Sequence, residues 1–231
     1  MATGRPRIGF LTIGQSPRED VVPEVVGLLG RDIDIVEAGA LDDLSYEEIV
    51  GKLFPSSSDT VYVSRLRDGR QAVLSKEKVI PLLQEKIEML ERKKVGLIVL
   101  LCSGEFPRFK SRVPIIYLDR VLKSFVEPLS HTVRSAGVVI PLEEQKRYAE
   151  EKWGRFFERV RVAPVSPYTG GEAELVKAAR YFKAEGLGLV IMDCIGYKLR
   201  HRRVVESTYK GLVITTRTSL ARYLAELLPE S

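Results

Sequence analysis

Lys94-Val-Gly-Leu-Ile-Val-Leu-Leu-Cys-Ser-Gly104 and Gly186-Leu-Gly-Leu-Val-Ile-Met-Asp-Cys-Ile-Gly196 are two versions of one segment. In each, a short apolar run ends in a cysteine that is followed two residues later by a glycine. Short runs of this kind, rich in β-branched residues, are typical of strands buried in a parallel sheet. A helical pattern rich in lysine and glutamate precedes each segment, and another strand pattern follows it. We therefore predict two similar halves with one cysteine at the C-terminal end of a buried strand in each.

Strand and helix patterns alternate along the rest of the chain. Strands are predicted over residues 8–13, 33–38, 95–101, 113–118, 136–140, 160–165, 187–192 and 212–215, and helices over 78–93, 142–157, 172–185 and 219–228. Asp68-Gly69, between two β-prone runs in 61–75, indicates a hairpin. Strands separated by helices of this length predict an α/β fold with two pseudo-twofold-related lobes, each a mostly parallel sheet flanked by helices. We expect one lobe from residues 1–120 with 217–231, the other from 121–216, and a cleft between them.

Composition narrows the class of protein. The 231 residues are 45% hydrophobic, and 36 basic against 31 acidic side chains give a formal net charge of +5. That small positive excess favours a small anionic ligand. No block of lysine and arginine dominates the chain, as it would in the basic tail of a nucleic-acid-binding protein. We find no signal-peptide pattern and no apolar run of membrane-spanning length. We therefore expect a cytoplasmic protein without a nucleic-acid or membrane partner, and the sequence leaves a homodimer open.

The small numbers of cysteines and histidines argue against a disulfide framework and a metal site. Cys102 and Cys194 are the two cysteines, and His131 and His201 the two histidines. These numbers form neither a disulfide framework nor a metal-ligand cluster. We expect no metal and no organic cofactor.

Both cysteines fall where a parallel sheet binds ligands, outside the carboxyl ends of its strands. If the halves face each other, the thiols of Cys102 and Cys194 approach one ligand from opposite sides. One thiolate then removes an α-proton while the other thiol returns one, which inverts a carbon centre. A free thiol titrates near ~8.5, so each needs surroundings that tune it. The alternative is that the cysteines are small buried hydrophobic residues.

The segment Thr12-Ile-Gly-Gln-Ser-Pro-Arg18 ends the first strand. Ser16 fits a helix N-cap and Pro17 the first helical position, so Arg18 and the helix N-terminus form a candidate carboxylate site with Thr12. Gln15 has no capping role and is added to the candidates. The alternative is a well-capped helix start alone.

A second arginine candidate lies in the predicted hairpin. Arg65 and Arg67 alternate with Leu66 and so share one face of a strand, where Arg65 is a candidate substrate clamp. The alternative is a solvated hairpin face.

Further candidate ligand contacts lie in the loops after the strands. Ser166 and Tyr168 follow a strand of the second half, where an ordinary loop is the alternative. The residues that follow each cysteine complete the candidate ligand-binding set: Ser103, Gly104, Ile195, Gly196 and Tyr197.

Several motifs together resemble the AroM family over nearly the whole chain: Leu11-Thr-Ile-Gly-Gln-Ser-Pro-Arg18, Arg65-Leu-Arg-Asp-Gly69, Leu101-Cys-Ser-Gly-Glu-Phe106 and Met192-Asp-Cys-Ile-Gly-Tyr197. By fold, this family is similar to the aspartate/glutamate racemase superfamily of cofactor-independent racemases, maleate isomerases and arylmalonate decarboxylases. The resemblance implies catalytic cysteines at the positions of Cys102 and Cys194. The racemases usually follow the cysteine with Asn-Thr or Thr-His, whereas this chain has Ser103-Gly104 and Ile195-Gly196.

The sequence thus favours a cofactor-independent isomerase or racemase-like enzyme that acts on a small carboxylate through two cysteines. A lyase or hydrolase that uses one cysteine is the second hypothesis. The third is a non-catalytic protein of the same fold that binds a small anion.

Overall fold

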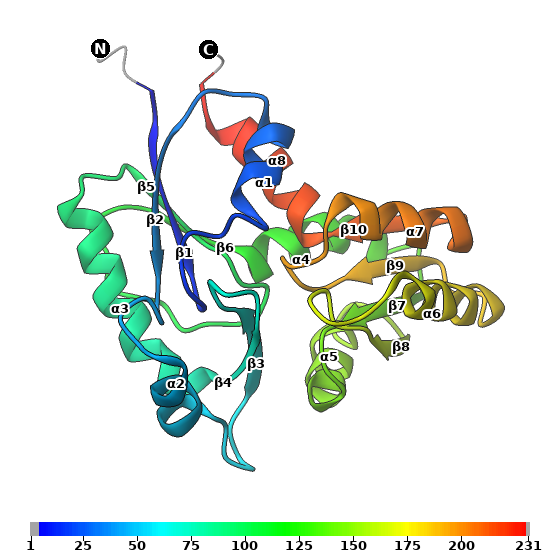
Figure 1. The fold of residues 1–231 in the computed structure, drawn as a ribbon. Helices are drawn as coiled ribbons and strands as arrows, with labels where there is room; N and C mark the ends of the chain where they lie inside the picture. Colours follow the sequence, from blue (N-terminus) through cyan, green and yellow to red (C-terminus); the bar gives the residue numbers. More distant parts are fainter. Residues whose placement is uncertain (1–4, 230–231) are drawn as a thin grey trace. The chain divides into compact units, whose positions relative to one another are not determined.

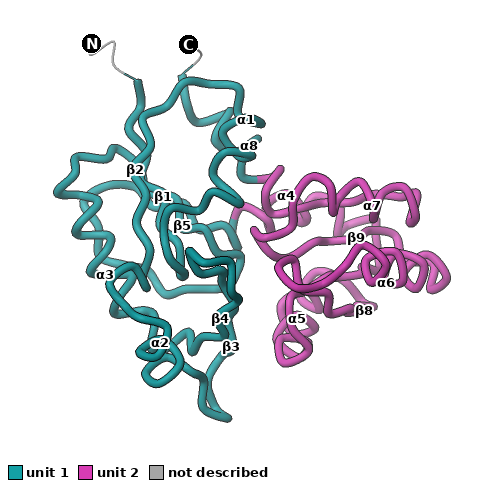
Figure 2. Tube along the Cα trace, in the orientation of Figure 1, with its two compact units in different colours: residues 1–120, 220–231 teal, residues 121–219 magenta. Residues whose placement is uncertain are grey.

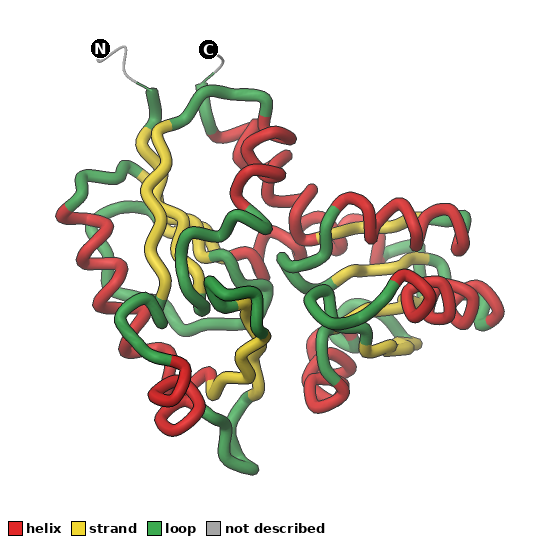
Figure 3. The backbone as a smooth tube through the Cα atoms, viewed as in Figure 1, coloured by secondary structure: helices red, strands yellow, loops and turns green. Residues whose placement is uncertain are grey.

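The computed structural model describes residues 5–229 as an alternation of strands and helices (Figures 1 and 3). Residues 1–4 and 230–231, the ends of the first expected lobe, lie outside the described residues. The strands are β1 (Arg7–Thr12), β2 (Asp34–Gly39), β3 (Val61–Arg65), β4 (Gln71–Ser75), β5 (Leu97–Leu100), β6 (Ile115–Tyr117), β7 (Ser135–Ile140), β8 (Arg159–Pro164), β9 (Leu189–Met192) and β10 (Leu212–Thr215). The helices are α1 (Val22–Leu29), α2 (Tyr46–Leu53), α3 (Lys76–Arg92), α4 (Leu118–Ser130), α5 (Lys146–Trp153), α6 (Glu172–Ala184), α7 (Leu199–Tyr209) and α8 (Thr216–Leu227), with a 3-10 turn at Glu143–Gln145.

The chain divides into two compact units (Figure 2). Unit 1 comprises residues 1–120 and 220–231, and unit 2 comprises residues 121–219. Both boundaries fall inside helices: α4 begins in unit 1 and continues in unit 2, and α8 begins in unit 2 and ends in unit 1. Unit 2 is therefore inserted into unit 1 along the sequence.

Each unit contains a four-stranded parallel sheet. The order in unit 1 is β2-β1-β5-β6 and the order in unit 2 is β10-β9-β7-β8. Read in reverse, the order of the second sheet is β8-β7-β9-β10, so that β2 corresponds to β8, β1 to β7, β5 to β9 and β6 to β10. The predicted α/β class, with two parallel sheets flanked by helices, is confirmed, and β5 and β9 hold the same place in their sheets.

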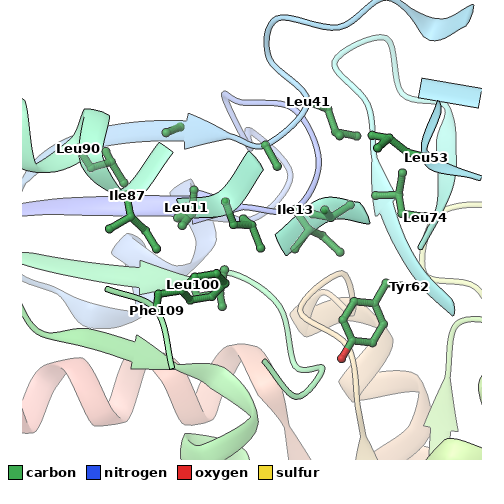
Figure 4. Close-up of a cluster of buried hydrophobic side chains, with 14 of the residues drawn as sticks. Leu11, Ile13, Leu41, Leu53, Tyr62, Leu74, Ile87, Leu90, Leu100 and Phe109 are labelled. Carbon is green, nitrogen blue, oxygen red and sulfur yellow. The ribbon is translucent and has the colours of Figure 1, made fainter. Parts of the chain in front are cut away.

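Buried apolar side chains explain why these segments form strands and helices. In unit 1, Leu11 of β1 and Leu100 of β5 belong to one cluster with Ile87 and Leu90 of α3, all of them fully buried (Figure 4). Strands that are covered on both faces need apolar residues at consecutive positions, which is the pattern seen in the sequence.

Unit 2 has a separate core cluster on each face of its sheet. Leu189 and Ile191 belong to the cluster that includes Trp153 of α5, whereas Val190 and Met192 belong to the cluster that includes residues of α6 and α7. This alternation is the period of two expected for a strand. The two faces of β9 are thus covered by different helices.

A hairpin, β3–β4, is added to unit 1. Its strands pair antiparallel from Val61 opposite Ser75 to Arg65 opposite Gln71. Gly69 adopts a φ of +91° in the turn, which a residue without a Cβ tolerates. The hairpin predicted from Asp68-Gly69 is confirmed.

Two predicted helices differ from the structure. The helix expected to begin at Pro17, after an N-cap at Ser16, begins at Val22, because residues 16–21 form an irregular loop and Pro23 stands in the first turn. The helix expected over 142–157 is shorter: a 3-10 turn leads into α5, which ends before Gly154.

Candidate active site

Cys102 lies two residues beyond β5, at the C-terminal edge of its sheet. The N–H of Leu101 donates to the carbonyl of Leu11 at 2.7 Å, which extends the β1–β5 ladder by one step. The N–H of Cys102 then turns back to the carbonyl of Leu100 at 2.8 Å. The cysteine is partly buried and forms no disulfide. The chain turns at the thiol instead of continuing the sheet.

Tyr62 of the hairpin holds the turn that follows Cys102. Its hydroxyl donates to the carbonyl of Glu105 at 2.8 Å. Its ring fills the space that a Cβ on Gly104 would occupy. Gly104 is therefore a site of close side-chain approach, which explains its residue type.

The hairpin also reaches the end of β1. A Cβ on Gly14 would lie 2.6 Å from the carbonyl oxygen of Arg65 and would overlap the side chain of Ser64. Tyr62 and Ser64, on one face of β3, thus meet the loops after β5 and β1 respectively. The hairpin packs on the edge where both loops lie.

Arg18 is buried, with 2% of its surface exposed. Its guanidinium forms a two-point pair with Asp20, from Nε at 2.8 Å and from Nη2 at 3.0 Å. Nη1 donates to the hydroxyl of Thr12 at 2.9 Å and to that of Ser64 at 3.4 Å. The predicted helix N-terminus beside Arg18 is wrong, because α1 starts four residues later. The contact of Arg18 with a ligand stays a prediction.

Gln15 and Ser16 connect three loops. Asp42 accepts from the N–H and the hydroxyl of Ser16, both at 2.7 Å, and from Nη2 of Arg67 at 3.0 Å. The amide of Gln15 donates to the carbonyls of Leu41 and of Leu44, and its oxygen accepts from the N–H of Arg67 at 3.0 Å. Asp42 was missed by the sequence analysis, and Ser16 binds it instead of capping a helix.

Arg65 and Arg67 do not share a strand face, because β3 ends at Arg65. Arg67 is exposed and bound to the Gln15–Ser16 loop, whereas Arg65 is partly buried beside the turn at Gly69. Within residues 5–229, the side chain of Arg65 forms no hydrogen bond or ion pair. A pocket of about 100 Å³ is lined by Pro17, Arg18, Glu19, Asp20, Arg65, Leu66 and Arg67. Arg65 therefore brings an uncommitted positive charge to this pocket.

Cys194 occupies the matching place in unit 2. It lies two residues beyond β9, and Asp193 donates its N–H to the carbonyl of Val139 at 2.9 Å, as Leu101 does to Leu11. The thiol sulfur accepts from the N–H of Gly196 at 3.4 Å. Cys194 is 7% exposed. The two cysteine turns thus begin with the same backbone hydrogen bond, but Cys194 is more deeply buried than Cys102.

A tyrosine also covers the glycine of this second turn. A Cβ on Gly196 would lie 2.8 Å from Cγ of Pro167 and 2.8 Å from the hydroxyl of Tyr168. The hydroxyl of Ser166 accepts from the N–H groups of Tyr168 and Thr169, both at 3.2 Å, and so closes its own turn. The predicted loop residues Ser166 and Tyr168 lie beside the Cys194 turn.

Tyr197 and Ile195 are core residues, 1% and 3% exposed. The hydroxyl of Tyr197 donates to the carbonyl of Val165 at 2.8 Å. Burial, followed by the nearby Cys194 and Asp193, raises the pKa of Tyr197 well above its ordinary value. Tyr197 is therefore a neutral phenol that connects the turn to Val165, the residue after β8.

Charged groups that the sequence analysis missed surround the Cys194 turn. Lys152 of α5 donates to both carboxylate oxygens of Asp193, at 3.1 and 2.8 Å, and the indole of Trp153 donates to one of them at 2.8 Å. Arg217 of α8 is 1% exposed and donates to the carbonyl of Ile195 from two nitrogens, at 3.2 and 2.8 Å. Charged side chains therefore bind both neighbours of Cys194: Lys152 binds the carboxylate of Asp193, and Arg217 binds the carbonyl of Ile195.

The structure thus gathers the predicted residues into two sets. Thr12, Gln15, Ser16, Arg18, Arg65 and the Cys102–Gly104 turn lie at the C-terminal edge of the first sheet, and Ser166, Tyr168 and the Cys194–Tyr197 turn at that of the second. In residues 5–229, no group of three histidine, cysteine or acidic residues could hold a metal ion. Nor does that part of the chain contain a helix with the length and apolar character that crossing a membrane requires.

Comparison with solved structures finds the same fold at low identity. A glutamate racemase from Francisella tularensis subsp. tularensis SCHU S4, in complex with D-glutamate, matches with a TM-score of 0.61 and 16% identity, over 97% of this chain and 81% of that chain. A maleate cis-trans isomerase from Nocardia farcinica gives 0.58 and 13% over 97% and 93%, and an arylmalonate decarboxylase gives 0.57 and 15% over 96% and 92%. No curated protein matches the sequence. The family described as AroM protein matches residues 8–228, and the chain therefore belongs to the AroM family.

Proposed function

We propose that this protein is a cofactor-independent isomerase or racemase-like enzyme that acts on a small carboxylate by two-cysteine acid/base chemistry. The observation that carries the proposal is the matched pair of cysteine turns. Each lies beyond the same strand of a four-stranded parallel sheet, where such sheets bind ligands, and each has a tyrosine packed on its glycine. The structural relatives named racemase and isomerase support this class of reaction.

The proposed reaction transfers one proton to the protein and one to the substrate. The thiolate of one cysteine takes the α-hydrogen as a proton, and the electron pair of the C–H bond stays on the substrate as a planar carbanion. The thiol of the other cysteine donates its proton to the opposite face, so that a new C–H bond forms and that cysteine becomes the thiolate. Turnover in the reverse direction restores the first state. This scheme requires both turns to face one ligand.

Arg65 is the group we propose for binding the carboxylate. It is a permanently charged side chain whose donors can form a two-point contact with a carboxylate. Arg18, by contrast, already binds Asp20 within unit 1. The reducing cytoplasm fits two cysteines that must stay thiols, and we propose that compartment.

Single serine variants test the proposal. Cys102→Ser should abolish inversion but leave exchange of the α-hydrogen of one enantiomer with solvent deuterium, and Cys194→Ser should leave exchange of the other enantiomer. Loss of one acid or base typically lowers the rate by about 10²–10⁴. Circular dichroism controls for folding. Two serine variants that invert the substrate at the parent rate would disprove the two-cysteine mechanism.

The unequal burial of the cysteines favours one alternative. Cys102 is partly exposed whereas Cys194 is 7% exposed, so a lyase that uses Cys102 alone as proton donor is the second candidate. In that case Cys194→Ser would keep turnover and Cys102→Ser would lose it. The relative named arylmalonate decarboxylase shares the fold.

A further inference from the structure

A second pocket of unit 1 lies at the opposite edge of the sheet from the Cys102 turn. α3 ends at Arg92, β5 begins at Leu97 and β6 begins at Ile115 (Figure 1). The pocket measures about 890 Å³ and is lined by residues from the end of α3, from the turn before β5 and from the loop before β6. Because β5 and β6 are parallel, both begin at the N-terminal edge of the sheet, whereas the Cys102 turn follows the C-terminal end of β5. The pocket is therefore separate from the candidate active site.

This pocket has an excess of positive charge. Four basic side chains line it, and we call them the basic cluster: Arg92, Lys94, Lys110 and Arg112. Within residues 5–229, none of these four side chains forms a hydrogen bond or an ion pair. Glu88 and Glu91 also line the pocket, so four positive and two negative side chains leave a formal charge of +2. Like charges gathered at one site repel each other, and a bound anion relieves that repulsion.

The loop before β6 is fixed on α3 through its backbone, so its basic side chains are not needed to hold it. Gln84 donates to the carbonyl of Lys110 at 2.9 Å and accepts from its N–H at 3.0 Å. Glu91 accepts from the N–H of Arg112 at 2.5 Å and from the hydroxyl of Ser111 at 2.8 Å. These two contacts lower the pKa of Glu91, which is therefore a carboxylate at neutral pH. The loop and α3 thus form two fixed walls of the pocket.

Lys94 occupies a backbone position that favours glycine. Its φ is +58°, whereas the matching residue of unit 2 is Gly186, with a φ of +61°. Unit 2 therefore makes the same turn without a Cβ in the left-handed region. Lys210, which follows α7, also has a positive φ, of +59°, so the conformation alone assigns no role to a lysine. What distinguishes Lys94 is that its side chain lines a pocket together with the rest of the basic cluster.

We propose that the basic cluster binds a small phosphorylated molecule. A phosphate ester carries about −1.5 to −2 charges at pH 7, which matches the positive excess of the pocket, whereas a simple carboxylate carries only one. The donors of an arginine fit two oxygens of a phosphate group, and a lysine binds such a group as a point charge. Pockets for small molecules measure about 300–1,000 Å³, so this pocket also has room for the rest of such a molecule. The proposed site does not depend on the two-cysteine reaction.

Calorimetry of the full chain with inorganic pyrophosphate tests the site. We expect saturable binding of one pyrophosphate per chain, with a dissociation constant below about 1 mM. A salt concentration of about 0.15 M screens unspecific attraction by exposed charges. Lys94→Gly should weaken binding by about fivefold. It should unfold at the parent temperature or above it, because glycine suits this backbone position. Lys110→Gln/Arg112→Gln leaves the backbone contacts of the loop in place and should weaken binding more than the single change.

Two further variants control for charge and for the backbone. Lys210→Gly removes one lysine from a left-handed position, as Lys94→Gly does, but Lys210 does not line the pocket. It should therefore keep the parent affinity for pyrophosphate. Lys94→Arg preserves the charge of the basic cluster and should bind pyrophosphate as the parent does.

Four results would overturn the inference. The first is a parent protein that does not bind pyrophosphate. The second is an equal loss of affinity in Lys94→Gly and Lys210→Gly, which would reduce the effect to net charge. The third is citrate, a tricarboxylate, binding as tightly as pyrophosphate, which would show that the pocket does not select phosphate. The fourth is a short single-stranded RNA that binds more tightly than pyrophosphate and loses affinity in the same variants, which would assign the basic cluster to a nucleic acid.

Discussion

Two arginines near the end of β1 have different surroundings. Arg18 is enclosed by Asp20, Thr12 and Ser64, whereas Arg65 faces a small pocket without a partner in the described residues. The distinction predicts opposite consequences when each is replaced. One change should affect the folded state, and the other should affect binding.

We expect Arg18→Ala to destabilise the protein by about 3–5 kcal/mol, because it leaves the buried carboxylate of Asp20 without its cation. Urea unfolding measures this loss. The double variant Arg18→Met/Asp20→Leu removes both charges and should recover most of the stability. A single variant as stable as the parent would mean that the pair is not buried as described.

We expect Arg65→Ala to weaken binding of a small carboxylate by about tenfold or more, since a charge-assisted contact contributes roughly 1.5–3 kcal/mol. Unfolding should be unchanged. Calorimetry with a carboxylate that stabilises the parent in a thermal-shift screen provides the measurement. Arg70→Ala, which removes an exposed arginine of the same hairpin, is the matched control. Equal affinity of the Arg65→Ala and Arg70→Ala variants for the carboxylate would show that Arg65 does not bind it.

At the scale of elements, the glycine after each cysteine lets a second element pack on the turn. We expect Gly104→Ala and Gly196→Ala to lower stability by about 1–3 kcal/mol, the usual cost of overpacking, because Tyr62 and Tyr168 must move. Both should also alter alkylation of the adjacent cysteine. Thermal unfolding and mass spectrometry measure the two effects.

The control for these variants is Gly27→Ala in α1. A Cβ at Gly27 meets nothing within 4 Å, and alanine is the better helix former. This substitution should stabilise by up to about 1 kcal/mol. If Gly196→Ala behaved like Gly27→Ala, the tyrosine would not be fixed on the turn.

Local signals in the sequence predict elements whose contacts are local. Asp68-Gly69 predicts the hairpin, and the apolar runs predict the strands of both sheets, which the structure confirms. The predicted start of α1 is wrong because the hydroxyl of Ser16 binds Asp42, 26 residues away. The Lys152–Asp193 pair was not predicted for the same reason, because its members are 41 residues apart in the sequence. A capping pattern carries no information on such a competing partner.

At the scale of the whole molecule, the pH dependence of the free energy of unfolding should show the effect of ionising Glu37. Burial raises the pKa of Glu37 above its ordinary value, although the N–H of Arg18 opposes this effect. A raised folded-state pKa means that ionisation costs the folded state more than the unfolded one. The contribution of Glu37 to stability therefore falls as the pH rises above about 4.5.

We accordingly expect Glu37→Gln to be more stable than the parent at pH 7, and the difference to vanish below about pH 4. Urea unfolding at several pH values measures it. Glu48→Gln is a control of opposite sign, because Lys52 lowers the pKa of Glu48 and the loss of that carboxylate removes a small stabilising effect at neutral pH. A Glu37→Gln difference that does not depend on pH would exclude ionisation as its cause.

The chain passes from unit 1 to unit 2 within α4 and returns to unit 1 within α8. This arrangement determines the order in which the two units can fold during synthesis. Unit 1 starts before unit 2, yet residues 220–229, which belong to unit 1, follow unit 2 in the chain. Unit 2, residues 121–219, is complete before them. Domains generally fold as they emerge during synthesis. The nascent chain should therefore close its second sheet first, while the first sheet waits for its final helical turns.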